Sequence, residues 1–291
     1  MDQNQENSLP SWVDLHVHTC YSDGLLTPGQ MVERAKREGL SAIGIADHDT
    51  IDGILEAVAV GKTLQIEVIP AVELSTQFNG KDVHILGYFI DISSPSLTEY
   101  LEKFRKERHH RAEKMIRNLN RSGIHISIEE VEKKARGQCI GRPHLAEVLV
   151  EKGYVRTIQE AFQHYIGYGS EAYEEKYQIS PEEAISLVVK AQGLSFLAHP
   201  GVGISESTLF HFVKLGLDGI EVVHPFLFED RQKFLKDIAK RYNLLMSGGS
   251  DCHGGRDGIF FIGRYKVPYA YLDEIRRAYQ KRWGQFPSLS F

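Results

Sequence analysis

The stretch WVDLHVHTCYSDGLLTPGQMVERAKREGLSAIGIAD, residues 12–47, decides the fold class. Its two apolar ends predict strands over residues 12–18 and 41–47, and the amphipathic segment between them predicts a helix over residues 28–39. Thr27 suits the N-cap of this helix, and the proline after it suits the first helical position. A strand, a helix and a strand in this order predict a βαβ unit with parallel strands.

The same alternation recurs on either side of a long helical stretch. Further strands are expected over residues 66–74, 82–90, 194–200, 219–225 and 244–251. Residues 96–177 are predicted to be mostly helical and to form an insertion domain, which leaves residues 12–95 and 178–291 for an α/β barrel. Roughly 205 residues then remain, at the low end of the roughly 200 to 250 of an eight-stranded barrel. We therefore expect a parallel sheet closed into a distorted (β/α)7 TIM-like barrel.

The composition is that of a globular protein without a disulfide scaffold. The chain has 291 residues, with 34 lysines and arginines against 39 acidic residues, and a formal charge of −5. Its 3 cysteines suit a reducing compartment. No uncharged apolar run approaches the ~18 residues of a membrane span, and residues 1–12 lack the basic and apolar regions of a secretory signal. We therefore expect a cytoplasmic protein that binds neither a membrane nor duplex DNA.

Histidines and carboxylates gather where the predicted strands end. His16 and His18 lie two positions apart on the first strand, so their side chains project to the same face. The other motifs are ADHDT (46–50), the Glu73 that closes IEVIPAVEL, AHPG (198–201) and GSDCHG (249–254). Parallel strands place their carboxyl ends at one mouth of a barrel, so these side chains are expected to meet there. Nitrogen and oxygen ligands without thiolates suit Zn, Mn or Fe.

Each of these signals also has an ordinary structural explanation. A pair such as His16 and His18 can simply alternate on a half-buried strand. Asp23 stands in a Ser-Asp-Gly turn, where aspartate is common. His84 lies inside an apolar run and is read alone as a hydrogen-bonded core histidine.

Taken together, the motifs DLHVHT, ADHDT, AHPG and GSDCHG resemble those of the PHP (polymerase and histidinol phosphatase) superfamily of metal-dependent phosphoesterases. The helical insertion with GRPHLA at 141–146 resembles the free-standing branch that dephosphorylates nucleotides such as 3′,5′-bisphosphonucleosides. Related members of that branch act as 5′→3′ exoribonucleases on short RNA. The resemblance implies a distorted (β/α)7 barrel that binds two or three divalent metal ions.

The resemblance also implies which side chains bind the metals. The first site would use His16, His18, Glu73 and Asp251; the second Asp23, His48 and His253; the third Glu73 as a bridge with His84 and His199. Asp23 stands where other branches carry histidine, which argues against the histidinol-phosphatase branch. Cys252 lies between two of these ligands in an extended stretch and is expected to point away from them.

Basic side chains in the insertion indicate an anionic substrate. Residues 103–121 hold eight lysines and arginines against two glutamates, a local charge of +6, which fits either a solvated helix face or a positive cap. Arg142 is the expected phosphate clamp, with His144 beside it, and Arg108 and Arg111 are expected at a second phosphate. His224 is expected to contact the substrate or to donate a proton to the leaving group.

The sequence therefore predicts a hydrolase of phosphoric esters in which a hydroxide bridging two metals attacks phosphorus. The expected substrate is a small phosphorylated anion, either a nucleotide such as a 3′,5′-bisphosphonucleoside or AMP, or the end of a short RNA. Two alternatives stay open at this point. One is a phosphatase of histidinol phosphate or another small molecule, and the other is a non-catalytic metal-binding module.

Overall fold

The computed structural model describes residues 11–135, 139–255, 258–287 and 289. Residues 1–10, which make up most of the segment inspected for a secretory signal, lie outside the described residues. An eight-stranded sheet in the order β7-β6-β5-β4-β3-β2-β1-β8 forms the centre. Its strands are β1 (Trp12–Val17), β2 (Ala42–Ile45), β3 (Glu67–Phe78), β4 (Lys81–Tyr88), β5 (Leu194–Leu197), β6 (Gly219–Val223), β7 (Leu245–Gly248) and β8 (Val267–Pro268).

The sheet curves into a nearly closed barrel. The segment after β7 returns to β1, where Val17 forms a parallel bridge with Cys252 and the amide of His18 donates to the Cys252 carbonyl at 3.0 Å. Six helices pack around the sheet: α1 (Pro28–Arg37), α2 (Ile54–Leu64), α7 (Pro181–Lys190), α8 (Glu206–Lys214), α9 (Glu229–Arg241) and α10 (Tyr269–Trp283). Thr27 is the N-cap of α1, as predicted, and it also forms a capping box with Gln30.

The prediction of an all-parallel sheet is wrong for β4 and for the unpredicted β8. Strand β4 is antiparallel to both β3 and β5, and β8 is antiparallel to β1. A two-residue turn, Asn79-Gly80, joins β3 to β4, and both residues have positive φ angles of 51° and 74°. Such a turn makes a hairpin, so no crossover helix lies between these strands.

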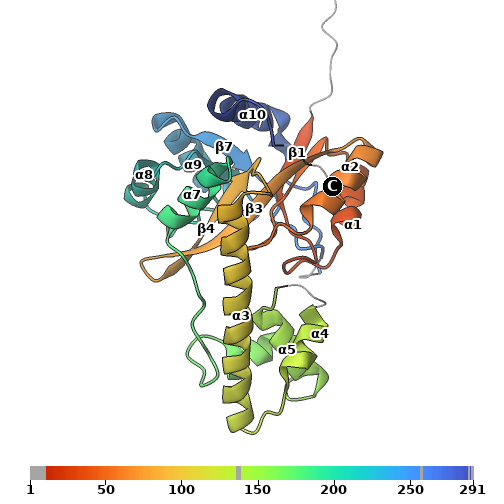
Figure 1. Cartoon of the computed structure of the whole chain (residues 1–291). Coiled ribbons are helices and arrows are strands. Elements are labelled where there is room, and N and C mark those ends of the chain that lie inside the picture. Colours follow the sequence, from red (N-terminus) through yellow and green to blue (C-terminus); the bar gives the residue numbers. More distant parts are fainter. Residues whose placement is uncertain (1–10, 136–138, 256–257, 288, 290–291) are drawn as a thin grey trace, which may run out of the picture.

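The insertion is helical, as predicted, and hangs below the barrel in Figure 1. It consists of α3 (Pro95–Arg121), α4 (Ile128–Ala135), α5 (Arg142–Glu151), α6 (Ile158–Ala161) and the π-helix η1 (Phe162–Ile166). The segment from Ile158 to Ile166 is thus α6 followed by a wider turn. That turn ends at Gly167, where a Cβ atom would lie 2.1 Å from the Phe162 carbonyl oxygen.

Helix α3 takes part in two separate hydrophobic cores. Its first half contributes Leu97, Tyr100, Leu101 and Phe104 to the barrel core. Its second half contributes Ala112, Met115, Ile116 and Leu119 to a core inside the insertion. Figure 1 shows the helix as one continuous rod between the two parts. None of the described helices has the length and apolar character needed to cross a membrane.

Candidate metal centre

The histidine pair of β1 lies inside the mouth of the barrel. His16 and His18 are fully buried, and their Nε2 atoms are 3.0 Å apart. The loop after β7 approaches this strand closely at Gly249, where a Cβ atom would lie 2.4 Å from the Cβ of His16. A glycine is therefore required for the loop to bring Asp251 beside the pair, 3.0 Å from His18 Nε2.

Glu73 is the hub of the centre. Its side chain is fully buried, and both carboxylate oxygens face imidazole nitrogens. Oε2 lies 3.1 Å from His16 Nε2, 3.2 Å from His18 Nε2 and 3.1 Å from His48 Nδ1, and Oε1 lies 2.9 Å from both His84 Nδ1 and His199 Nε2. Five imidazoles thus surround one carboxylate.

Glu73 does not close its strand, in contrast to the sequence prediction. Strand β3 continues five residues further to Phe78, and its outer part pairs with β4. Glu73 still lies at the mouth because β2 ends at Ile45 and the segment beyond it reaches Glu73 through a bridge at His48. His84 likewise stands within β4, opposite Ser75, rather than at a carboxyl end.

The nine predicted ligands come together in overlapping groups. Three sets of side chains have ligand atoms that all lie within 4.8 Å of one another: His16, His18, Glu73 and Asp251; His18, Asp23, His48 and His253; and His48, Glu73 and His84. The second set adds His18 to the predicted trio, and the third replaces His199 by His48. His199 reaches the centre through its contact with Glu73. Cys252 is fully buried in the barrel core and belongs to none of these sets.

Hydrogen bonds fix the orientation of two of the imidazoles. Glu221 Oε1 lies 3.1 Å from His16 Nδ1, and the backbone carbonyl of Asp251 lies 2.8 Å from His253 Nδ1. When Nδ1 donates to such an acceptor, Nε2 keeps its lone pair and points into the site. His253 Nε2 then faces Asp23 Oδ1 at 3.2 Å. This donor set fits divalent metal ions.

The charges of the centre support the same conclusion. Burial opposes ionisation of Glu73, but the surrounding histidines hold its pKa well below the usual range. Burial likewise disfavours charge on His18, yet its bonds to Asp251 and Glu73 raise its pKa to about 10. The carboxylates of Glu73, Glu221 and Asp251 overcome burial and raise the pKa of His16 well above normal. A bound cation would replace these imidazole protons.

Three buried carboxylates support the centre. They were not assigned to the site from the sequence. Glu221 on β6 accepts from His16 and also from the backbone N–H of His199 at 2.7 Å. Asp47 accepts from the amide of Thr19 at 2.7 Å and from Ser22 Oγ at 2.6 Å, which holds the loop that carries Asp23. Asp14 accepts from the amide of Ser250 at 2.8 Å. The signal was present, because a carboxylate in an apolar strand needs a partner.

The predicted phosphate-binding residues line a cavity of about 190 Å³ beside the centre. The metal-site residues Asp23 and His48 form part of its wall, and Arg108, Arg111, Arg142, His144 and Lys176 form much of the rest. Lys176 was not predicted. Burial lowers the pKa of its ammonium, and no carboxylate is hydrogen-bonded to it among the described residues. The cavity therefore offers four cationic side chains next to the metal centre.

Aromatic rings and backbone groups hold these cations in place. The guanidinium of Arg108 lies 5.0 Å from the ring of Phe104, and that of Arg142 lies 5.5 Å from the ring of Tyr173. Arg111 Nε donates to the Glu174 carbonyl at 2.8 Å. Burial and the nearby Arg142 lower the pKa of Arg111 to about 10.

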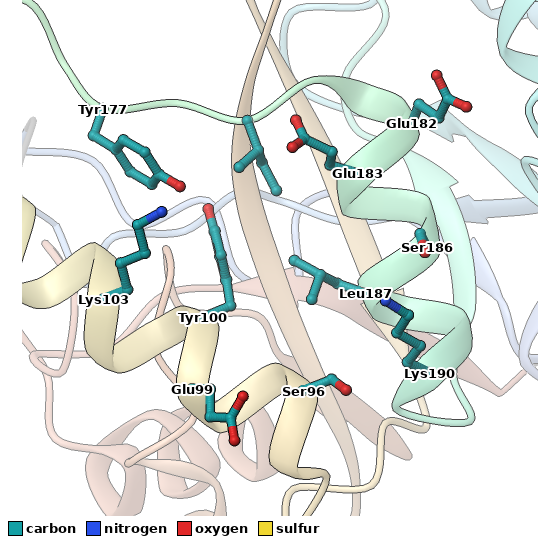
Figure 2. A pocket seen from close by; sticks show the side chains of 11 residues that line it. Ser96, Glu99, Tyr100, Lys103, Tyr177, Glu182, Glu183, Ser186, Leu187 and Lys190 are labelled. Atoms are coloured by element: carbon teal, nitrogen blue, oxygen red, sulfur yellow. The ribbon is translucent and has the colours of Figure 1, made fainter.

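The remaining charges of the basic run lie elsewhere. Arg105 pairs with Asp52, while Lys106, Lys114, Arg117 and Arg121 are exposed. Lys103 lies 4.8 Å from the ring of Tyr177 in a second cavity, of about 620 Å³, between α3 and α7. Figure 2 shows that this cavity also collects Glu99, Glu182 and Glu183, so it is poorly suited to a polyanion. Only two charges of the run, Arg108 and Arg111, face the metal centre.

His224 lies on another side of the centre from these arginines. Its side chain is 1% exposed, and its Nε2 lies 3.3 Å from Asp251 Oδ2. Its Nδ1 accepts from the amide of Phe226 at 3.2 Å, so Nε2 is the nitrogen that donates to Asp251. His224 does not line the arginine-containing cavity.

Comparisons with known proteins agree with this geometry. The family model of the PHP domain matches residues 14–198. A 5′-3′ exoribonuclease of Haemophilus influenzae is 33% identical over 82% of this chain and 89% of its own length. A 3′,5′-nucleoside bisphosphate phosphatase of Chromobacterium violaceum is 33% identical over 84% of this chain and 90% of its own.

A solved structure gives the same result for the fold. A protein of Bifidobacterium adolescentis described as a metal-dependent phosphoesterase superposes with a TM-score of 0.83 at 30% identity, covering 92% of this chain and 96% of that one. The distorted barrel, the buried His, Glu and Asp groups and the matched family model lead to one conclusion. This chain belongs to the PHP family and is a metal-dependent phosphoesterase.

Proposed function

We propose that this phosphoesterase hydrolyses phosphate monoesters of nucleotides, with 3′,5′-bisphosphonucleosides and AMP-like nucleotides as substrates. The supporting observation is the cavity in which Arg108, Arg111, Arg142 and Lys176 face the metal-site residues Asp23 and His48. A substrate with two phosphate groups can place one at the metal centre and the other among these cations. The bisphosphate phosphatase of Chromobacterium violaceum supports the same substrate class.

The proposal gives each group of residues a task. Two or three divalent ions (Mn, Zn or Fe), held by the nine predicted ligands, would supply Lewis-acid catalysis and an activated water. Arg142 clamps phosphate oxygens with its planar guanidinium, and His144 contacts the substrate beside it. His144 Nδ1 accepts from the Gly141 amide at 3.1 Å, which leaves Nε2 as its donor. The predicted role of His224 in contacting substrate or donating a proton stays a prediction. Its hydrogen bond to Asp251 supports a role in orienting that carboxylate.

We further propose that residues 96–177 act as a substrate-capping domain on a barrel formed by residues 12–95 and 178–291. The separate hydrophobic core of the insertion supports this division. Arg108, Arg111 and Arg142 come from the insertion, whereas Asp23 and His48 come from the barrel, so the cavity requires both parts.

A second candidate activity is 5′→3′ removal of nucleotides from short RNA. A further cavity, of about 530 Å³, shares Ser22 and His144 with the arginine-lined one and is also lined by Lys134. It provides room for the nucleotides that follow the terminal one. The exoribonuclease of Haemophilus influenzae supports this candidate.

The test is a phosphate-release assay with Mn-loaded protein. The panel comprises 3′,5′-bisphosphoadenosine, AMP, histidinol phosphate and a 5′-phosphorylated short RNA, whose shortening is followed on a gel. Activity is expected on the nucleotides and should disappear after chelation and return with Mn²⁺. Release of phosphate from histidinol phosphate alone would contradict the proposal.

A paired set of variants tests the second phosphate. Replacing Arg108 and Arg111 by alanine is expected to raise KM for 3′,5′-bisphosphoadenosine by roughly tenfold or more, and to raise KM for AMP less, because charged hydrogen bonds contribute about 1.5–3 kcal/mol each. The matched control replaces Lys114 and Arg117, which are exposed on the same helix and carry the same charge. Equal effects of the two pairs would show that general charge, and not the cavity, attracts the substrate.

A further inference from the structure

Two phenylalanines in the loop that follows His224 have exposed side chains. Phe226 and Phe228, in the loop between β6 and α9, are 74% and 81% exposed. In the neighbouring loop after β5, Val202 is 86% exposed. Single exposed apolar side chains are common, but several on neighbouring loops near an active site are typical of a surface that binds a ligand.

The loop that carries these rings is held firmly. Leu227, between the two phenylalanines, is buried, and its amide donates to the His224 carbonyl at 3.0 Å. Gln232 Nε2 donates to the Leu227 carbonyl at 2.9 Å. The rings are therefore presented by an ordered backbone, which lowers the entropy that binding must overcome.

An arginine of α9 anchors the neighbouring loop at two points. Arg231 Nε donates to the Pro200 carbonyl at 2.9 Å, and its Nη2 donates to the Ile204 carbonyl at 2.7 Å. Helix α9 begins at Glu229, directly after the loop of the phenylalanines. Arg231 therefore holds the two loops against each other. In the sequence, Val202 lies between Pro200 and Ile204, whose carbonyls are anchored in this way.

The exposed ring of Phe226 is connected to the metal centre through two histidines. The ring of Phe226 lies 5.5 Å from that of His224, and the ring of His224 lies 5.2 Å from that of His199. His199 Nε2 is in turn 2.9 Å from Glu73. Two ring contacts thus lead from Phe226 to His199, which contacts Glu73, on the β5–β6 side of the centre. The arginine-lined cavity lies on the side of Asp23 and His48.

We propose that Phe226 and Phe228 form a stacking platform for the base of the substrate nucleotide. This inference rests on the proposed function, since it requires that the substrate carries a base. A nucleobase fits the site because it is flat, stacks on phenyl rings and is linked through ribose to the phosphate that must reach the metals. With the base on this side and the second phosphate at the arginines, the ribose lies across the centre.

The experiment compares two monoesters that differ only in the base. Kinetics on AMP and on ribose 5-phosphate are measured for the wild-type protein, for F226A, F228A and the double variant, and for F226W. The stacking of one base contributes ~1–3 kcal/mol, so the ratio of kcat/KM on AMP to that on ribose 5-phosphate should fall roughly 5- to 150-fold in the double variant. F226W should keep the ratio, because indole also stacks.

A matched control is F210A. Phe210 is a partly exposed phenyl on α8 that packs 5.3 Å from the ring of Tyr242, away from the metal ligands, and its removal should leave the ratio unchanged. The multimeric state of each variant is measured by light scattering, because the same patch would also suit contact with a second copy.

The possible results separate the two proposals. If the wild-type protein hydrolyses neither AMP nor 3′,5′-bisphosphoadenosine, the proposed function fails and the platform fails with it. If the wild-type protein hydrolyses them and the double variant keeps the wild-type ratio, the platform alone is refuted. An equal loss of kcat/KM on both substrates would show that the rings support the metal centre. A loss of dimerisation in the variants would show that the rings contact a second copy. Either result overturns the proposal.

Discussion

Replacing Glu221 by glutamine should weaken metal binding, although Glu221 is not among the predicted ligands. The carboxylate accepts two hydrogen bonds, from His16 Nδ1 at 3.1 Å and from the His199 amide at 2.7 Å. A glutamine amide has one oxygen and one NH₂ group, so it can satisfy only one of these donors. If it serves His199, its NH₂ faces His16 Nδ1, and the imidazole must carry its proton on Nε2, where the metal should bind.

The size of the effect follows from these contacts. The substitution removes one charge-assisted hydrogen bond in a fully buried position, which is worth about 1.5–3 kcal/mol. The loss of an orienting carboxylate behind a metal-binding histidine typically costs 10- to 100-fold in affinity, or about 1.4–2.8 kcal/mol. Both estimates agree, and we expect the Kd for Mn²⁺ at the site of His16 to rise by roughly 10- to 100-fold.

Calorimetric titration of chelator-treated protein with Mn²⁺ measures this change directly. The matched control is Glu67→Gln, at the start of β3, which removes the same charge from an ion pair with Arg276 at 2.8 Å, outside the metal centre. The control should bind Mn²⁺ as the wild type does. Unchanged affinity in Glu221→Gln, or an equal loss in both variants, would refute the idea that Glu221 fixes the imidazole of His16.

Two further predictions concern the packing around the centre and within the insertion. Gly249→Ala should abolish stoichiometric Mn²⁺ binding in calorimetry, because the new Cβ would lie 2.4 Å from the Cβ of His16 and 2.6 Å from its backbone nitrogen; normal binding would show that the β7 loop can shift freely. Leu149→Ala, in the core of the insertion, should cost about 2–5 kcal/mol of unfolding free energy in denaturant titrations. Its Mn²⁺ affinity should stay near the wild-type value, since every predicted ligand lies in the barrel, and a large loss of affinity would show that the two cores do not fold separately.

Most strands and helices could be predicted from the sequence to within a few residues, but the direction of β4 was missed. An apolar run such as residues 82–90 has the same pattern in either direction, and the pairing partner decides its direction. A local signal did exist, because Asn79-Gly80 is a typical turn of a tight hairpin. Strand β8 has only two residues, too few for any periodicity.

Most of the candidate ligands could be found from sequence motifs, whereas the groups that support them depend on distant parts of the chain. Glu221 meets His16 from 205 positions away, and no local pattern reveals that contact. Lys176 and Arg108 line one cavity although they lie near opposite ends of the insertion in the sequence. The basic run of residues 103–121 contributes Arg108 and Arg111 to this cavity, and its other charges lie elsewhere, because charge along a helix does not show which face is covered.

Helix α3 has a mechanical consequence for catalysis. Because its two ends are embedded in different cores, the insertion cannot swing away from the barrel unless this 27-residue helix bends or one core opens. Arg108 lies between Phe104 and Ala112, the last and first residues that the helix gives to these cores, and so in the segment that joins them. The arginine-lined cavity is therefore built before substrate arrives, and turnover should not depend on the slow closing of a lid.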